Sequence, residues 1–247
     1  MPRRIHTSQV RAGDLTLSDR EAHHARDVLR LTTGETVEVF GDAGAVARGT
    51  IISCDARGVV VRVEEPASDD GASTAIHLTI AAAVPKGDRA DWMIEKLSEL
   101  GVQRFIPLAT ARSVVLPEGK NKPERWARIA TEAAKQSRRR GVMRIEELTK
   151  LDAALRDPGG ARWVLSTTGQ ATSVIDLVAR NAPPSVTAFI GPEGGWTEEE
   201  LAQFTTGRAI AVQLTSTILR VETAAVAVAA IVGSVPYGAL RESPNVP

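Results

Sequence analysis

The 247-residue sequence predicts an α/β protein with a mostly parallel sheet, preceded by a smaller β-rich domain. From about residue 75 onwards, predicted strands and helices alternate, which is typical of a parallel sheet covered by helices on both faces. Before residue 68 the apolar residues fall into Val- and Ile-rich runs that predict strands. A polar stretch at 66–74 separates the two patterns and is the best linker candidate. We therefore expect domains at residues 1–70 and 75–247.

The N-terminal part predicts one helix among several strands. Ser18 and Glu21 have the spacing of a capping box, so a helix is expected from there to about Leu31. The strands are expected at 36–40, 46–52 and 59–63, with a hairpin loop at 41–44 between the first two.

The C-terminal part predicts a longer alternating series. Strands are expected at 76–83, 104–108, 162–166, 187–190 and 209–213. Helices are expected at 88–100, 123–139, 173–180, 197–204 and 222–234, the second with a proline near its start.

Composition narrows the class of protein. Hydrophobic residues make up 43% and charged residues 24%, as in ordinary globular proteins. Lys and Arg number 30, as do Asp and Glu, which excludes a polycation but not a local basic patch. The single cysteine, Cys54, excludes an intramolecular disulfide and a Cys-cluster zinc site, and no other spacing predicts a metal. A signal-peptide pattern is missing and the apolar run at 224–232 is short, so we expect a cytoplasmic protein without a membrane span.

A glycine-rich turn after the strand predicted at 187–190 is the first candidate binding loop. It consists of Gly191, Pro192, Glu193, Gly194 and Gly195, and Thr197 and Glu200 then mark a helix start. Glycines let the backbone approach a ligand, and open α/β sheets bind ligands at the carboxyl ends of their strands. The pattern is neither a dinucleotide fingerprint nor a Walker loop. An ordinary tight turn is an equally good interpretation.

The segment 214–225 also joins a predicted strand to a helix. Arg220 and Glu222 stand at the start of the most apolar helix of the sequence. On local pattern alone, an ion pair at the helix start is the simpler interpretation, because a carboxylate is favoured at that end of the helix dipole.

Residues 120–144 form a basic stretch in an otherwise neutral chain. Nine Lys or Arg residues stand against two Glu residues there, a net charge of +7. On the predicted helix, an apolar stripe (Trp126, Ile129, Ala130, Ala133) leaves Arg125, Arg128, Lys135 and Arg139 projecting away from it. A solvated face is the usual interpretation of such charges, but this asymmetry is what a phosphate backbone would select.

Together, these segments resemble the 16S ribosomal RNA uracil-N3 methyltransferases of the SPOUT superfamily. The resemblance runs along nearly the whole chain. Its most specific parts are 190–195 and 219–224. Further matches lie at 85–89, 95–96, 99–102, 112–113 and 132–137, and at His23, His24, 28–31 and Gly34 near the N-terminus.

The resemblance implies a PUA-like β-barrel domain and a SPOUT methyltransferase domain with a C-terminal trefoil knot. It also implies a homodimer that binds S-adenosyl-L-methionine in the knot and methylates N3 of a specific uridine in the 16S rRNA of the 30S subunit. The implied cofactor-binding residues are Leu165, Ser166, Thr167, Gly191, Pro192, Glu193, Gly194, Gly195, Leu214, Ser216, Ile218 and Leu219.

The expected RNA-binding surface combines the basic stretch with matched motif residues. It comprises Arg30, Lys86, Arg89, Arg112, Arg125, Arg128, Arg138, Arg139 and Arg140.

The sequence departs from the family pattern in two places. Thr215 and Thr217 stand where the family usually has Gly and Arg, so a glycine that could supply positive φ or close cofactor approach is replaced at Thr215. Arg138 replaces another usual Gly, whereas Arg139 keeps the expected arginine position.

The implied reaction needs an activated uracil. The imide is protonated at neutral pH, and loss of its proton spreads negative charge over two flanking carbonyl oxygens. We hypothesise Arg220 or Arg139 as the electrostatic stabiliser. Glu222 is a candidate general base or the residue that orients Arg220, and a structural role at the helix start is at least as good an interpretation.

Two other functions stay open on the sequence. One is a ribosome-assembly RNA-binding protein whose cofactor pocket has decayed, which only Thr215 and Thr217 support. The other is a SPOUT ribose 2′-O-methyltransferase, against which the motif order and the N-terminal domain argue.

Overall fold

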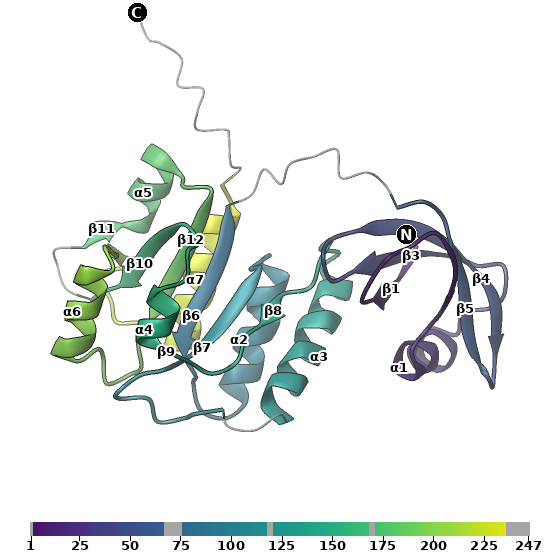
Figure 1. Cartoon of the computed structure of the whole chain (residues 1–247), viewed down its shortest axis with the longest axis horizontal. Coiled ribbons are helices and arrows are strands. Elements are labelled where there is room, and N and C mark those ends of the chain that lie inside the picture. Colours follow the sequence, from purple (N-terminus) through teal and green to yellow (C-terminus); the bar gives the residue numbers. More distant parts are fainter. Residues whose placement is uncertain (1, 67–75, 118–120, 168–170, 236–247) are drawn as a thin grey trace, which may run out of the picture. The chain divides into compact units, whose positions relative to one another are not determined.

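The computed structural model describes residues 2–66, 76–117, 121–167 and 171–235 (Figure 1). The chain divides into two compact units: residues 1–72 with 131–142, and residues 73–130 with 143–247. The predicted linker lies, apart from Pro66, outside the described residues. Each unit is considered by itself below.

The N-terminal unit is built on a five-stranded sheet, and the three strands predicted there are confirmed. Its first and third strands pair in parallel and the other pairs are antiparallel. The strand order is β1 (Arg3–Thr7), β3 (Thr36–Gly41), β4 (Val46–Asp55), β5 (Gly58–Val63) and β2 (Gly13–Thr16). The sequence analysis missed β1 and β2, because each carries a single large apolar residue, Ile5 or Leu15.

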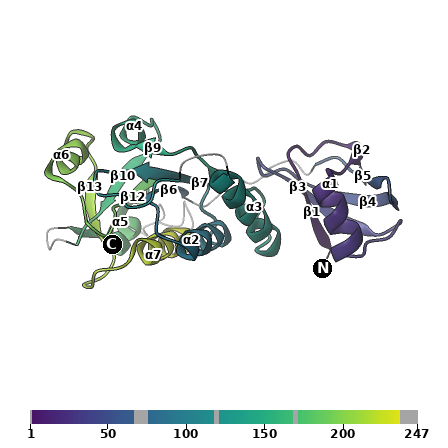
Figure 2. The same ribbon diagram turned by 90° about the horizontal axis from the view of Figure 1, so that it is seen from below.

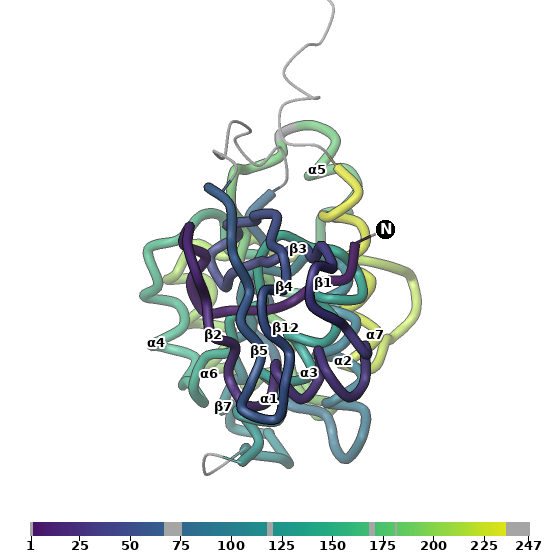
Figure 3. The backbone as a smooth tube through the Cα atoms, turned by 90° about the vertical axis from the view of Figure 1, so that its right-hand side faces the viewer, coloured from purple at the N-terminus to yellow at the C-terminus, as the bar shows by residue number. Residues whose placement is uncertain are grey.

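A short helical segment completes this unit (Figure 3). It consists of α1 (Asp19–His23) and a π-helical continuation, η1 (His24–Val28). Ser18 accepts a hydrogen bond from the Glu21 N–H at 3.4 Å, as the predicted cap requires. The Glu21 carboxylate accepts bonds elsewhere, from the His6 N–H at 3.3 Å and from Lys135 Nζ at 2.6 Å.

Arg4 fastens residues 131–142 within this unit. Its Nη1 donates to the carbonyl oxygens of Ala134 (3.0 Å) and Arg139 (2.9 Å), and its Nε lies 2.6 Å from the Glu38 carboxylate. The guanidinium also stacks 4.1 Å from the centre of the Phe40 ring. Arg4 thereby satisfies carbonyls at the end of a helix that would otherwise lack donors.

Lys135 corrects one detail of the sequence analysis. It was expected to project away from the apolar stripe of its helix, but it is buried. The reason is electrostatic: its ammonium pairs with the buried carboxylate of Glu21 at 2.6 Å, which offsets the cost of removing both charges from water.

The C-terminal unit confirms the mostly parallel sheet. All strand pairs that the structure describes in this sheet are parallel. The order is β11 (Thr172–Ser173), β13 (Ile210–Gln213), β10 (Ala161–Leu165), β12 (Ser185–Ile190), β6 (His77–Ala83), β7 (Arg104–Ala109) and β8 (Arg144–Ile145), and β9 (Thr149–Lys150) also pairs with β7. The central strands are buried on both faces, which explains their continuous apolar runs.

Helices cover both faces of this sheet (Figure 2). On one face lie α2 (Asp88–Glu99), α5 (Val174–Asn181) and α7 (Val221–Gly233), and on the other lie α4 (Leu151–Leu155) and α6 (Glu198–Thr206). The helix α3 (Asn121–Gln136) packs Trp126 edge-on against Phe105 of β7. The most apolar helix, α7, contacts α2, β6 and β12, as its composition predicts. In the described part of the chain, no helix has both the length and the hydropathy to cross a membrane.

Replacing Arg4 with Met should lower the free energy of unfolding by about 3 kcal/mol, because Glu38 and the end of α3 would lose a buried charged partner. Urea unfolding followed by circular dichroism measures this change. The control is Arg3→Met, an exposed neighbour on the same strand. Equal unfolding midpoints for the two variants would contradict the anchoring role of Arg4.

Candidate functional site

The glycine-rich turn follows β12 directly and leads into α6, whose start is fixed by hydrogen bonds. The capping box predicted for α6 is confirmed: the Thr197 N–H donates to Glu200 Oε2 at 2.9 Å, and the Glu200 N–H donates to Thr197 Oγ1 at 3.3 Å. The buried Glu200 also accepts from the Ala111 N–H at 2.9 Å. One carboxylate therefore ties the loop after β7 to the start of α6.

Two glycines of this turn meet steric or conformational demands. A Cβ on Gly191 would lie 2.9 Å from Cε2 of Trp196, whose ring is itself packed against Phe204 with 4.8 Å between centroids. Gly195 has a φ of +71°, which L side chains rarely adopt. The turn can therefore keep this shape only with glycine at these positions.

Arg112 holds the turn from outside. Its Nη1 donates to the carbonyl oxygens of Gly194 at 2.7 Å and Trp196 at 3.4 Å. A Cβ on Gly194 would stand 3.3 Å from Arg112 Cδ, so the arginine stem lies close against the glycine backbone. Arg112 was predicted to bind RNA, and the structure gives it a contact with the glycine-rich turn.

The three segments predicted to bind the cofactor follow neighbouring strands. The sheet order places β10 between β12 and β13, all parallel, so their carboxyl ends share one edge. Leu165–Thr167 leaves β10, Gly191–Gly195 leaves β12 and Leu214–Leu219 follows β13. The Ser166 N–H donates to the Val212 carbonyl at 2.9 Å, which fixes two of these strand ends together.

The substituted loop after β13 forms a compact turn. Thr215 Oγ1 accepts from the Thr217 N–H at 3.2 Å and donates to the Thr217 carbonyl at 2.9 Å. Within the described ranges, positive φ among non-glycine residues occurs at Arg30, Arg138 and Arg208, and Thr215 has an ordinary φ. The glycine that the family usually carries there is therefore not needed for the backbone of this loop. Ile218 on the same loop is 83% exposed.

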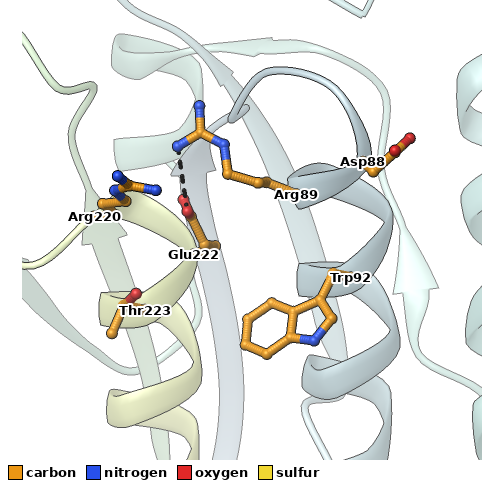
Figure 4. Close-up of a pocket in the computed structure, with 6 residues that line it drawn as sticks. All are labelled: Asp88, Arg89, Trp92, Arg220, Glu222 and Thr223. Carbon is orange, nitrogen blue, oxygen red and sulfur yellow. Dashed lines mark hydrogen bonds and ion pairs between the residues drawn. The ribbon is translucent and has the colours of Figure 1, made fainter.

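A pocket of about 610 Å³ lies between the first turns of α2 and α7 (Figure 4). It is lined by Asp88, Arg89, Trp92, Arg220, Glu222 and Thr223. The lining thus combines charged groups of both signs with the indole ring of Trp92. The residue Trp92 is 45% exposed.

Glu222 is the buried charge of this pocket. Its side chain is only 8% exposed, and its Oε1 lies 3.2 Å from Nη1 of Arg89 on α2. The same Arg89 Nη1 lies 3.8 Å from Glu193 Oε1 of the glycine-rich turn. The local pairing of Arg220 with Glu222 that the sequence suggested is thus replaced by a pair between two helices, and Arg220 is an exposed N-cap of α7.

The other oxygen of Glu222 has a distinct environment. Oε2 is buried and has no hydrogen-bond partner among the residues that the structure describes. A buried carboxylate oxygen without a donor costs free energy, so this atom is the chemically unsatisfied point of the pocket.

The remaining predicted residues divide between the two units. Arg30, Arg138, Arg139 and Arg140 belong to the N-terminal unit, whereas Lys86, Arg125 and Arg128 belong to the C-terminal unit. Burial lowers the pKa of Arg139 to about 10, so its guanidinium still carries its charge at neutral pH. Arg125 is paired with Asp91, which also accepts from Trp126 Nε1 at 3.0 Å.

Sequence reasoning missed Trp92 and the partner of Glu222. Trp92 lies on a predicted helix at a position outside its apolar face, and that placement is the signal that could have found it. The pairing of Arg89 with Glu222 spans 133 residues, which no local pattern reveals. Groups of His, Cys, Asp or Glu able to hold a metal are not found within the described ranges.

Residues 72–233 match a protein family described as an RNA methyltransferase domain, and residues 17–64 match an RNA methyltransferase PUA domain. The chain belongs to this RNA methyltransferase family. The resemblance of its motifs is thereby confirmed, as is the PUA domain of its N-terminal part.

Individual members of the RNA methyltransferase family are similar to this chain along most of its length. The ribosomal RNA small subunit methyltransferase E of Bacillus subtilis is 32% identical over 223 residues, covering 86% of this chain and 87% of the relative. The crystal structure of the enzyme of that name from Neisseria gonorrhoeae, bound to S-adenosyl methionine, superposes with a TM-score of 0.82 at 26% identity, covering 93% of this chain and 96% of the other. A Legionella pneumophila methyltransferase in complex with S-adenosyl methionine gives 0.81 at 26% identity, with 94% and 97% covered.

Replacing Gly191 with Ala should lower the free energy of unfolding by about 1–3 kcal/mol, because the new methyl group would press on the packed Trp196 ring. The urea midpoint of tryptophan fluorescence measures it. Gly159→Ala is the control, since a Cβ there would meet only an Asp157 carboxylate oxygen at 3.4 Å. If both variants matched the unchanged protein, the close fit at Gly191 would be disproved.

Proposed function

We propose that this protein methylates N3 of a specific uridine in the 16S rRNA of the 30S subunit, with S-adenosyl-L-methionine as methyl donor. The observation that carries the proposal is the gathering of three loops at one edge of a parallel sheet, in a chain that belongs to an RNA methyltransferase family. The relatives from Bacillus subtilis and Neisseria gonorrhoeae are named small subunit rRNA methyltransferases, and two solved structures of similar fold hold S-adenosyl methionine.

The residues of the three loops fit such a cofactor. The glycine-rich turn leaves open space beside Gly195, where a Cβ would meet nothing within 4 Å, and glycine backbone of this kind lets a nucleoside approach closely. We assign cofactor binding to Leu165–Thr167, Gly191–Gly195, Leu214, Ser216, Ile218 and Leu219. Arg112 and Glu200 hold the shape of the turn through the bonds already described.

The bound cofactor supplies an electrophilic methyl group. The residues of this chain must then place the uracil nitrogen in line with that group and remove its proton. Glu222 is the candidate acceptor of the N3 proton, because its Oε2 has no donor of its own. We assign to Arg220, an exposed cation that lines the same pocket, the stabilisation of the negative charge that spreads to the carbonyl oxygens. Arg139 remains the alternative stabiliser.

The wider assembly is part of the proposal. We infer a trefoil knot in the C-terminal domain and a cytoplasmic homodimer, as the resemblance implies. The domains are assigned to residues 1–70 and 75–247. The RNA surface is assigned to Arg30, Lys86, Arg89, Arg112, Arg125, Arg128, Arg138, Arg139 and Arg140.

Incubation with labelled S-adenosyl methionine and 30S subunits lacking the modification should place label at N3 of one uridine, located by mapping of the modified base.

Arg220→Gln should slow single-turnover transfer by about 10²-fold with cofactor affinity unchanged, because a charge-stabilising donor is lost. Arg208→Gln is the control, because Arg208 is also exposed but precedes the strand β13, whereas Arg220 follows it.

Two outcomes would contradict the proposal. Absence of both transfer and cofactor binding would favour an RNA-binding protein without catalysis. Label on a ribose 2′-oxygen would show that the ribose, and not the base, is methylated.

Replacing Arg138, Arg139 and Arg140 all by Gln should weaken binding to 30S subunits. The negative slope of log K against log salt should become shallower by about 2, since fewer counterions are released from phosphates. Equilibrium binding at several salt concentrations measures the slope. The control removes the same charge from three exposed arginines elsewhere: Arg11, Arg57 and Arg156. An unchanged slope in the first variant would refute the assignment of these arginines to RNA.

A further inference from the structure

The pocket between α2 and α7 contains an acceptor without a donor. Glu222 directs one oxygen to Arg89 and keeps the other, Oε2, buried with no partner in the described part of the chain. The pair with Arg89 holds the side chain, since one carboxylate oxygen is fixed at 3.2 Å from a guanidinium nitrogen. Because Oε2 is buried, the Glu222 carboxylate has to turn toward the pocket before a ligand N–H group can satisfy this oxygen.

The pocket also touches the glycine-rich turn. Arg89 lies beside Glu193 of that turn as well as beside Glu222, at 3.8 Å and 3.2 Å. A ligand in the pocket would therefore lie next to the loop that we assign to the cofactor. Arg89 and Arg220 can donate to oxygen atoms of the ligand, and Trp92 offers an aromatic face to a planar one.

We propose that this pocket recognises the target base as an imide, with Glu222 as the residue that selects uracil over cytosine. This inference rests on the proposed function. Uracil presents an N3–H donor between two carbonyl oxygens. Figure 4 shows the Glu222 carboxylate between the side chains of Arg89 and Arg220, which matches that pattern. Cytosine presents a lone pair at N3, which a carboxylate oxygen repels.

The same contact explains how product would leave. Methylated N3 has no hydrogen to donate, so the product cannot form this hydrogen bond with Glu222. The pocket therefore binds the methylated base more weakly than uracil, which favours release after each turnover.

The test measures binding rather than turnover. Equilibrium binding is compared for 30S subunits that carry uracil, cytosine or 3-methyluracil at the mapped position, in the presence of S-adenosylhomocysteine, which has no methyl group to transfer. The unchanged protein should prefer uracil to both others by about tenfold or more. Glu222→Gln should abolish the preference over cytosine, because the amide can donate to the cytosine N3.

Asp88→Asn is the matched control, since it removes a carboxylate from the lining of the same pocket at an exposed position. It should keep the preference for uracil. Arg89→Gln should weaken the preference and Arg89→Lys should restore part of it, as expected for a residue that positions Glu222.

Trp92 provides a test that does not depend on a buried residue. Trp92→Ala should weaken binding of all three subunits by about tenfold, and Trp92→Phe should retain most of the affinity, because stacking tolerates any aromatic ring. Equal affinities for Trp92→Ala and the unchanged protein would overturn the stacking contact.

The outcomes separate this inference from the proposed function. If Glu222→Gln kept the full preference for uracil while the unchanged protein transferred methyl to uridine, the selection role would be wrong and the function would stand. If the unchanged protein preferred uracil in binding but transferred no methyl to N3, the pocket would be supported and the proposed function overturned.

Discussion

The parallel register of the large sheet is the constraint on which the rest of the site depends. Because β6, β12, β10 and β13 run in the same direction, the loops that follow them all leave from one edge. Those loops supply the glycine-rich turn, the two other predicted cofactor segments and the connection into α2. The helices α2 and α7 begin at that edge and pack on each other, so Arg89 and Glu222 meet although 133 residues separate them.

The sequence predicted the features that local pattern encodes. Val- and Ile-rich runs located the central strands, and the Thr197–Glu200 spacing located a capping box that the structure confirms. The strand β1 escaped prediction because Ile5 is its one large apolar residue; its other buried residue is Arg4, whose burial depends on Glu38, Phe40 and the end of α3. The pocket could not be predicted from local pattern either, because its ion pair joins Arg89 and Glu222, which only the fold brings together.

The basic stretch shows why a count of charges differs from a charged surface. The stretch carries +7, yet Lys135 is buried against Glu21 and Arg125 is paired with Asp91. Both cations are largely used within their own unit, where they stabilise packing. Arg128, Arg138 and Arg140 are exposed, and in the RNA-binding role that we propose they would contact phosphates. Contacts with phosphates do not read the base sequence, so under the proposed function base selection has to come from another part of the molecule.

Glu222 is where such selection can arise. Its neighbours on α7, Val221, Ala224 and Ala225, are buried and apolar, and an apolar side chain at this position would avoid the cost of burying a carboxylate. The pair with Arg89 offsets part of that cost but leaves Oε2 without a donor. A fold that only needed stability would gain from removing this charge. Its place beside the glycine-rich turn is instead what a site requires when it must distinguish a base that carries an N–H from one that does not.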